Sequence, residues 1–184
     1  MQDPNQFLGS LLLLLGGLGL AAGVVLLAFP RGLRAGLLAF PRSKWPGWIL
    51  TAICVFWVTW VVRHAALGRF EAVKPVIPVL GFLTFGAIVW LLDELLAPRA
   101  LGGLLILVAN PMLMGVRWAD SAWRFVIVAI AYAWVLAGCA LMLHPWLFRK
   151  LAAPVADSPG RLRLVAAGKL LGGGVLLAAG LWLR

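Results

Sequence analysis

Long runs of apolar residues without a charged side chain limit the fold of this chain more than any other feature. The first run, residues 8–29, already exceeds the roughly 20 residues that a helix needs to cross the hydrocarbon core of a bilayer. Hydrophobic residues make up 64% of the sequence, charged residues 12%, and the mean hydropathy is +1.03. A soluble domain of 184 residues cannot bury that much apolar surface. The sequence therefore predicts an integral membrane protein.

The runs predict an all-α polytopic bundle of about six transmembrane helices in a single domain, residues 1–184. No alternation of polar and apolar residues indicates a membrane strand. The amino-terminal tail carries no basic residue, unlike a cleavable signal peptide, so we expect the first helix to be retained. The predicted spans are residues 8–29, 48–62, 76–96, 100–116, 122–143 and 164–183.

Short basic segments bounded by proline follow the first and fifth runs. Residues 30–41 alternate basic and apolar residues at roughly helical spacing, which is typical of a helix lying in the membrane interface. A similar segment begins at Pro145, and we call both segments elbows. Their cations are expected to anchor the chain to anionic lipid head groups. These predicted anchors are Arg31, Arg34, Arg42, Lys44, Arg149 and Lys150.

The two elbows occupy matching places in a candidate internal repeat. Pro30, Arg34 and Ser43 each have an identical residue 115 positions later. Such an offset is expected if a helix hairpin was duplicated in parallel. Matches are few in so apolar a chain, and chance similarity is the alternative.

Three glycines of the first run, Gly16, Gly19 and Gly23, are spaced three and four residues apart. They therefore share one helix face, on which another backbone can approach closely. The alternative is that glycine is simply common in membrane helices.

The distribution of cations predicts the orientation. The first, third and fifth connections hold ten Lys and Arg residues, against five in the second and fourth. The fifth connection was counted from Arg149 to Lys169. The positive-inside rule then places these three connections in the cytoplasm. We expect a bacterial inner (plasma) membrane with both termini outside the cytoplasm. Because the net charge of +10 is scattered at the ends of apolar runs, we expect lipid and not nucleic acid as its partner.

Histidine and cysteine give no cofactor or metal site. His64 and His144 are the only candidates for paired haem ligands, but they end spans on opposite faces, about 30 Å apart. Cys54 and Cys139 lie far apart in apolar runs without metal-ligand spacing. We therefore expect no cofactor and no metal.

The middle of the chain carries polar residues whose role is structural or related to transport. Asp93 and Glu94 are expected at head-group depth, facing Arg99 across a turn at Pro98. Adjacent carboxylates on a helix point about 100° apart, so they do not form an acid–base pair. With no catalytic motif elsewhere, we expect no enzyme and no catalytic residue.

Asn110 and Pro111 interrupt the fourth run. Pro111 cannot donate to the carbonyl of Leu107, which predicts a kink. The freed carbonyl and the Asn110 amide need partners away from lipid, so this face is expected inside the bundle. A break that binds a solute is the alternative.

Two classes of function remain. The first is a non-catalytic structural or accessory subunit that acts through helix contacts with other membrane proteins or with a second copy. The second is a small oligomeric transporter or channel whose path lies at the central helix pair. The first is favoured because the carboxylates and histidines all fall at span ends or in connections, away from the midplane.

Overall fold

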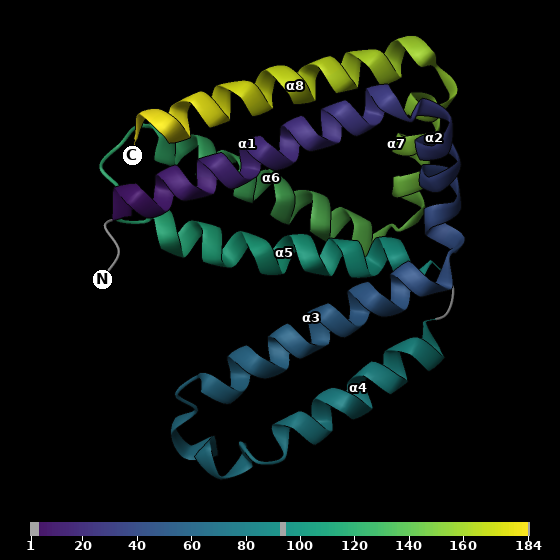
Figure 1. Cartoon of the computed structure of the whole chain (residues 1–184). Coiled ribbons are helices and arrows are strands. Elements are labelled where there is room, and N and C mark those ends of the chain that lie inside the picture. Colours follow the sequence, from purple (N-terminus) through teal and green to yellow (C-terminus); the bar gives the residue numbers. More distant parts are fainter. Residues whose placement is uncertain (1–3, 93–94, 184) are drawn as a thin grey trace.

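The computed structural model describes residues 4–92 and 95–183, and within these ranges every regular element is a helix (Figure 1). The predicted all-α bundle is confirmed. Asp93 and Glu94 lie outside the described residues. Five helices are long and apolar enough to cross a membrane. They are α1 (Pro4–Ala28), α3 (Lys44–His64), α5 (Leu96–Val116), α6 (Trp123–Leu143) and α8 (Pro159–Trp182).

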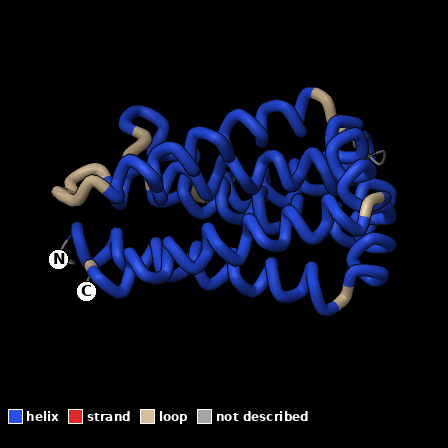
Figure 2. The backbone as a smooth tube through the Cα atoms, turned by 90° about the horizontal axis from the view of Figure 1, so that it is seen from above, coloured by secondary structure: helices blue, strands red, loops and turns tan. Residues whose placement is uncertain are grey.

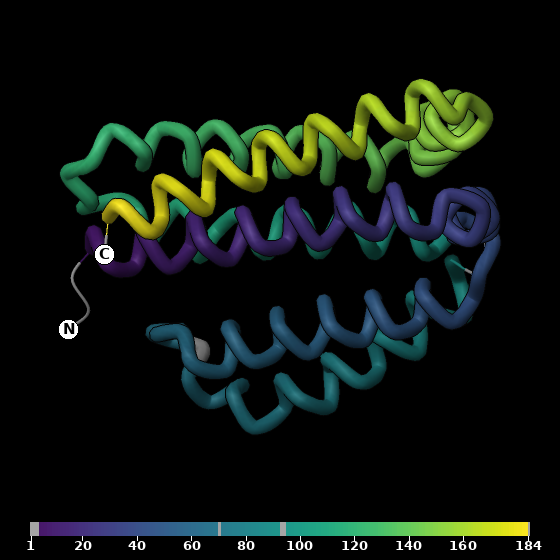
Figure 3. Tube along the Cα trace, turned by 45° about the horizontal axis from the view of Figure 1, so that its top comes forward, coloured from purple at the N-terminus to yellow at the C-terminus, as the bar shows by residue number. Residues whose placement is uncertain are grey.

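The remaining helices are shorter. α4 (Ile77–Leu91) has 15 residues and is apolar, but at 1.5 Å per residue it is about 22 Å long, less than a hydrocarbon core of about 30 Å. It lies antiparallel beside α3 and returns the chain toward the elbows (Figures 1 and 3). The others are α2 (Pro30–Ala39), η1 (Phe40–Arg42), η2 (Gly68–Val73) and α7 (Trp146–Asp157).

Both elbows form helices, and they lie at the same end of the molecule (Figure 1). We call this the elbow end. The two chain ends lie together at the opposite end, which we call the terminal end (Figure 2). The chain runs between these two ends six times, through α1, α3, α4, α5, α6 and α8, so it finishes at the end where it began.

The predicted boundary between the third and fourth runs is wrong by about four residues. α4 ends at Leu91 and α5 begins at Leu96, so Pro98 and Arg99 lie in the first turn of α5 and not in a connecting turn. Proline is tolerated there because the first N–H groups of a helix have no acceptor within it. The backbone reverses at Leu95, whose φ of 55° is left-handed.

Glycine gives α1 and α8 their close contact. A Cβ placed on Gly16 would lie 2.8 Å from the carbonyl oxygen of Gly173, and a Cβ on Gly173 would lie 2.8 Å from the carbonyl oxygen of Gly16. A Cβ on Gly23 would meet the side chain of Leu170 at 2.7 Å. The predicted packing face on α1 is confirmed, and its partner is α8 of the same chain.

Glycine also allows close contact between α5 and α6. A Cβ on Gly102 or on Gly138 would lie 2.6 Å from the carbonyl oxygen of the other residue. Leu8 and Leu12 of α1 are fully buried in a core with residues of α5 and α6, among them Val116. The four helices α1, α5, α6 and α8 therefore form the packed part of the bundle.

The hairpin of α3 and α4 is attached more loosely. α3 packs on α5 near the elbow end, where a Cβ on Gly47 would lie 3.1 Å from the backbone nitrogen of Ala97. Away from that contact, α3 diverges from α5 (Figure 1). α4 has no buried residue, and its main helix contact is with α3.

Helix boundaries support the internal repeat. α1 ends at Ala28 and α6 at Leu143, while α3 begins at Lys44 and α8 at Pro159, so both pairs keep the offset of 115 residues. The serines that precede α3 and α8 are also 115 residues apart and both have extended backbone. α1 and α6 run in the same direction, from the terminal end to the elbow end (Figure 1). Each unit of the candidate repeat consists of a long helix, an elbow and a second long helix.

Candidate functional site

The two elbows contact one another. The rings of Phe40 and Phe148 lie 5.0 Å apart between their centroids. A guanidinium nitrogen of Arg34 on α2 donates to Asp157 at the end of α7, at 2.8 Å. Since both side chains are more than half exposed, this ion pair positions the elbows but contributes only about 0–1 kcal/mol.

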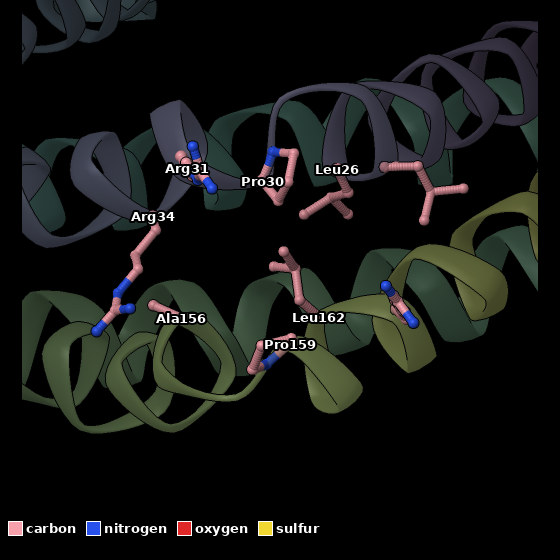
Figure 4. A pocket seen from close by; sticks show the side chains of 9 residues that line it. Leu26, Pro30, Arg31, Arg34, Ala156, Pro159 and Leu162 are labelled. Atoms are coloured by element: carbon pink, nitrogen blue, oxygen red, sulfur yellow. The ribbon is translucent and has the colours of Figure 1, made fainter.

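A cavity of about 350 Å³ lies beside this ion pair, and we call it the elbow pocket. It is formed where α1 ends, α2 begins, α7 ends and α8 begins. Figure 4 shows Leu26 and Pro30 on one side of it, Leu162 and Pro159 on the other, and Arg34 extending from α2 toward α7. Its cationic lining residues are Arg31, Arg34 and Arg163.

Sequence reasoning identified two of these three arginines. Arg31 and Arg34 were predicted to anchor lipid, whereas Arg163 was counted with the fifth connection but not among the anchors, because it lies beyond the elbow. It belongs to α8, four residues after the helix begins. The other predicted anchors lie outside the pocket lining. Lys150 places its amine 5.5 Å from the ring centre of Trp146. Arg42 and Arg149 are exposed, and Lys44 begins α3.

The central polar residues do not form a site among the described parts of the chain. Asn110 and Pro111 are exposed, so the prediction that their face lies inside the bundle is wrong. α5 continues through Pro111, and the face turned to the core is that of Ala109 and Met112. Arg99 is half-buried in the first turn of α5. Nothing in the described structure shows its predicted partners, Asp93 and Glu94.

The two histidines lie at opposite ends of the molecule. His64 ends α3 at the terminal end, where its Nδ1 lies 2.8 Å from the carbonyl oxygen of Trp60 and its ring lies 4.3 Å from the Trp60 ring. His144 follows α6 at the elbow end, with its ring 6.2 Å from that of Trp146. One haem cannot bind both. In residues 4–92 and 95–183, no three His, Cys, Asp or Glu side chains are grouped to hold a metal ion.

One cation lies deep along a transmembrane helix. Lys169 was counted with the fifth connection, but it comes ten residues after the start of α8, or about 15 Å along it. A Cβ on Gly19 of α1 would lie 3.5 Å from the carbonyl oxygen of Lys169. Gly19 is itself nine residues, about 14 Å, before the end of α1. The distance of about 15 Å from the start of α8 is half the thickness of a hydrocarbon core of about 30 Å.

Lys169 lines a groove of about 400 Å³ between α1, α6 and α8, which we call the Lys169 groove. Trp134 of α6 forms one wall. Gly168 and Gly172 also line it, and a Cβ on either would meet nothing within 4 Å. No carboxylate pairs with Lys169 among the residues that the structure describes. Without Lys169, the connections at the elbow end hold nine Lys and Arg residues, and the connections at the terminal end hold five.

An apolar cavity of about 620 Å³, which we call the apolar wedge, is lined by residues of α3, α4 and α5 and by Met142 of α6. Two of its polar lining side chains form hydrogen bonds to backbone. The Thr84 hydroxyl donates to the carbonyl oxygen of Leu80 at 2.7 Å, and the Cys54 thiol donates to the carbonyl oxygen of Ala100 at 3.5 Å. Such a surface suits acyl chains or apolar side chains.

Comparison of the chain with families of proteins, with curated proteins and with solved structures gives no match. The features of the structure that bear on function are the elbow pocket, the Lys169 groove and the apolar wedge.

Proposed function

We propose that this protein is a non-catalytic integral membrane subunit that acts through contacts between its helices and those of another membrane protein. The observation that carries the proposal is Lys169, a cation near half the depth of the membrane in a groove that opens outward. A lysine at the centre of a membrane helix costs about 2.5–3.5 kcal/mol by insertion measurements. A carboxylate from a neighbouring transmembrane helix would offset that cost by pairing with the amine.

The shape of the Lys169 groove supports a helix as the occupant. Gly168 and Gly172 lie one turn apart on α8 and leave open space where a side chain would stand. Helices in membranes approach closely at such positions, since dispersion contacts and buried polar pairs, and not the hydrophobic effect, drive their association. The partner we propose is a transmembrane helix that carries Asp or Glu at the depth of Lys169.

A transporter is the second candidate, and Lys169 is also the observation that favours it. An ionisable group at this depth is typical of a path for charged solutes. A path for charged solutes inside this chain would need buried polar side chains, and among the described residues only Thr51 is a buried polar residue. Lys169 itself is exposed on the outside of the packed helices. A path for solute would require further chains around the groove.

For the orientation, we propose that the elbow end faces the cytoplasm of a bacterial cell and that both termini lie outside. The excess of cations at the elbow end supports this, because cytoplasmic connections carry more Lys and Arg. A cytoplasmic elbow end would also bring the elbows against the leaflet with the more negative surface.

The experiment compares Lys169→Leu and Lys169→Arg in the full chain, expressed in its native host and purified in mild detergent. We expect a co-purifying membrane protein with a carboxylate inside a predicted span. Lys169→Leu should lose it, and Lys169→Arg should retain it. Lys150→Leu removes a lysine from an elbow and is the matched control.

A charge exchange gives the decisive result. Lys169→Asp should fail to bind the native partner and should bind again when the partner's carboxylate is replaced by Lys. If Lys169→Leu keeps the partner at the wild-type level, the side chain has reached the head groups along α8, and the proposal is refuted. If no partner is found and Lys169→Leu abolishes the flux of an anionic solute in proteoliposomes, the transporter is correct.

A further inference from the structure

The elbow pocket is lined by three arginines that come from two separate parts of the chain. Arg31 and Arg34 come from α2 and Arg163 from α8. Arg34 is already paired with Asp157, at 2.8 Å. Within the described residues, neither Arg31 nor Arg163 forms an ion pair. Two arginines without an ion pair among the described residues therefore line the pocket and are available to an anion.

The backbone adds to the positive potential of these arginines. α2 has ten residues and begins at Pro30 on the wall of the pocket, and no side chain caps its first turn. α8 also begins at the pocket, although there the Ser158 hydroxyl accepts from the N–H of Arg161. Two helix N-termini therefore converge on one cavity, each with the positive end of its dipole.

The other walls are apolar. Leu26 and Leu27 are near the end of α1, and Leu162 is in the first turn of α8. A volume of about 350 Å³ lies in the range of about 300–1,000 Å³ that is usual for small-molecule sites. The pocket lies where the candidate spans α1 and α8 meet the elbows, and we therefore place it at the depth of lipid head groups.

We propose that the elbow pocket is a binding site for a phosphate group, and that the phosphate is that of an anionic glycerophospholipid. The planar guanidinium groups of Arg31 and Arg163 bind its oxygens with paired hydrogen bonds, and the free N–H groups of the first turn of α2 complete the contacts. The leucines contact the first carbons of the acyl chains. A single lipid then joins α1 and α2 of the first repeat unit to α8 of the second.

This site differs from general attraction of the elbows to an anionic surface. General attraction depends on the number of cations, each contributing about equally. At a defined binding site, the loss of affinity depends on which cations are removed. The two readings are separable by variants of equal charge.

The experiment measures binding of phosphatidylglycerol to the detergent-solubilised full chain, by native mass spectrometry and by the lipid-dependent shift in melting temperature. The double variant Arg31→Gln with Arg163→Gln should weaken binding by about ten- to a hundredfold, since hydrogen bonds to charged groups are strong. The matched control is Arg42→Gln with Arg149→Gln, which removes the same charge outside the pocket. It should change binding by less than about threefold.

Two further arms identify the ligand. Phosphatidylcholine tests the need for net negative charge, and inorganic phosphate at equal concentration tests whether a soluble anion suffices. Binding of phosphatidylglycerol well above both supports the lipid site. Binding of inorganic phosphate as tight as that of the lipid supports the phosphate site but refutes the lipid as its source.

Equal weakening in the pocket variant and the control would refute the proposal, because attraction would then be general. Far-ultraviolet circular dichroism of each variant without lipid distinguishes lost binding from lost structure. Asp157→Asn provides a test in the opposite direction. It removes the negative charge beside the pocket and the ion pair of Arg34, so phosphatidylglycerol should bind more tightly. Weaker binding in Asp157→Asn would contradict the site.

Discussion

A single methyl group at the contact of α1 with α8 should destabilise the whole bundle. Gly173→Ala would place its Cβ 2.8 Å from the carbonyl oxygen of Gly16 and 2.8 Å from the backbone nitrogen of Leu20. Real Cβ atoms essentially never approach other atoms closer than 3.0 Å, and ordinary contact begins at 3.4 Å. Both obstructing atoms belong to backbone, so no side chain can rotate away. The helices themselves must separate.

The separation needed is about 0.6 Å, the difference between 3.4 and 2.8 Å. A gap of about 0.5–1 Å removes a quarter to a half of the dispersion energy of each affected atom pair, which is about 0.1–0.2 kcal/mol when intact. Some tens of pairs lie along this contact, and overpacking of a tight site typically costs about 1–3 kcal/mol. We therefore expect Gly173→Ala to lower the free energy of unfolding by about 1–3 kcal/mol.

The neighbouring residue is a matched control. A Cβ on Gly174 would meet nothing within 4 Å, so Gly174→Ala adds the same methyl group to the same turn of α8 without a clash. It should be neutral, or should stabilise the helix by up to about 1 kcal/mol because alanine loses less backbone entropy than glycine. Unfolding in mixed micelles of increasing dodecyl sulfate content, followed by circular dichroism, measures both variants. Equal stability of the two variants would refute the argument.

Three other predictions follow from the elbows and connections. Reporter fusions at Ala35 and at the carboxy terminus should report a cytoplasmic elbow and an external terminus, and cytoplasmic activity at the carboxy terminus would overturn the orientation. Asp157→Asn should lower the free energy of unfolding by no more than about 1 kcal/mol, because its ion pair is exposed; a larger loss in denaturant titration would contradict this. A hydrogen bond from Lys74, at 2.6 Å, lowers the pKa of the Glu71 carboxyl, and the N–H of Leu67 adds to the effect. The ion pair thus contributes stability above the ordinary glutamate pKa and loses it as pH falls through the lowered pKa; in NMR titration, Lys74→Gln should raise the pKa of Glu71, and an unchanged value would refute the assignment.

The class of fold and the elbows could be predicted from the sequence because their signals are local. In lipid, a run such as residues 8–29 is stable as a transmembrane helix. Pro30 and the arginines that follow it mark where the run must end. The glycine face of α1 was visible for the same reason, since Gly16, Gly19 and Gly23 share a face by spacing alone. Which helix would cover that face was not predictable, because the partner is α8, at the other end of the chain.

The errors arise where local rules compete. Pro98 was read as part of a turn, yet proline is equally suited to the first turn of a helix, and α5 begins before it. Asn110 was expected inside the bundle because its amide needs a partner, but burial is decided by tertiary packing, and Ala109 with Met112 occupies the core face. Lys169 was counted with a connection because it is charged, although the predicted span 164–183 already contained it. α8 begins at Pro159, five residues earlier than predicted, and this places Lys169 ten residues into the helix.

The two units of the candidate repeat lie in different environments in the same molecule. In the second unit, α8 is fixed along its length by backbone contacts with α1, through Gly16 and Gly173. In the first unit, the equivalent helix α3 contacts α5 closely at Gly47 and then diverges, leaving the apolar wedge beside it. α3 contacts α5 along its first half, from Gly47 to Cys54, and α4 has no buried residue, so the α3–α4 hairpin has fewer contacts to lose when it moves than the packed helices have. Helix contacts with another protein would therefore reposition this hairpin at lower cost than any element of the packed part. If the Lys169 groove holds the partner, a partner helix there would leave the wedge on α3 and α4 accessible for a second contact.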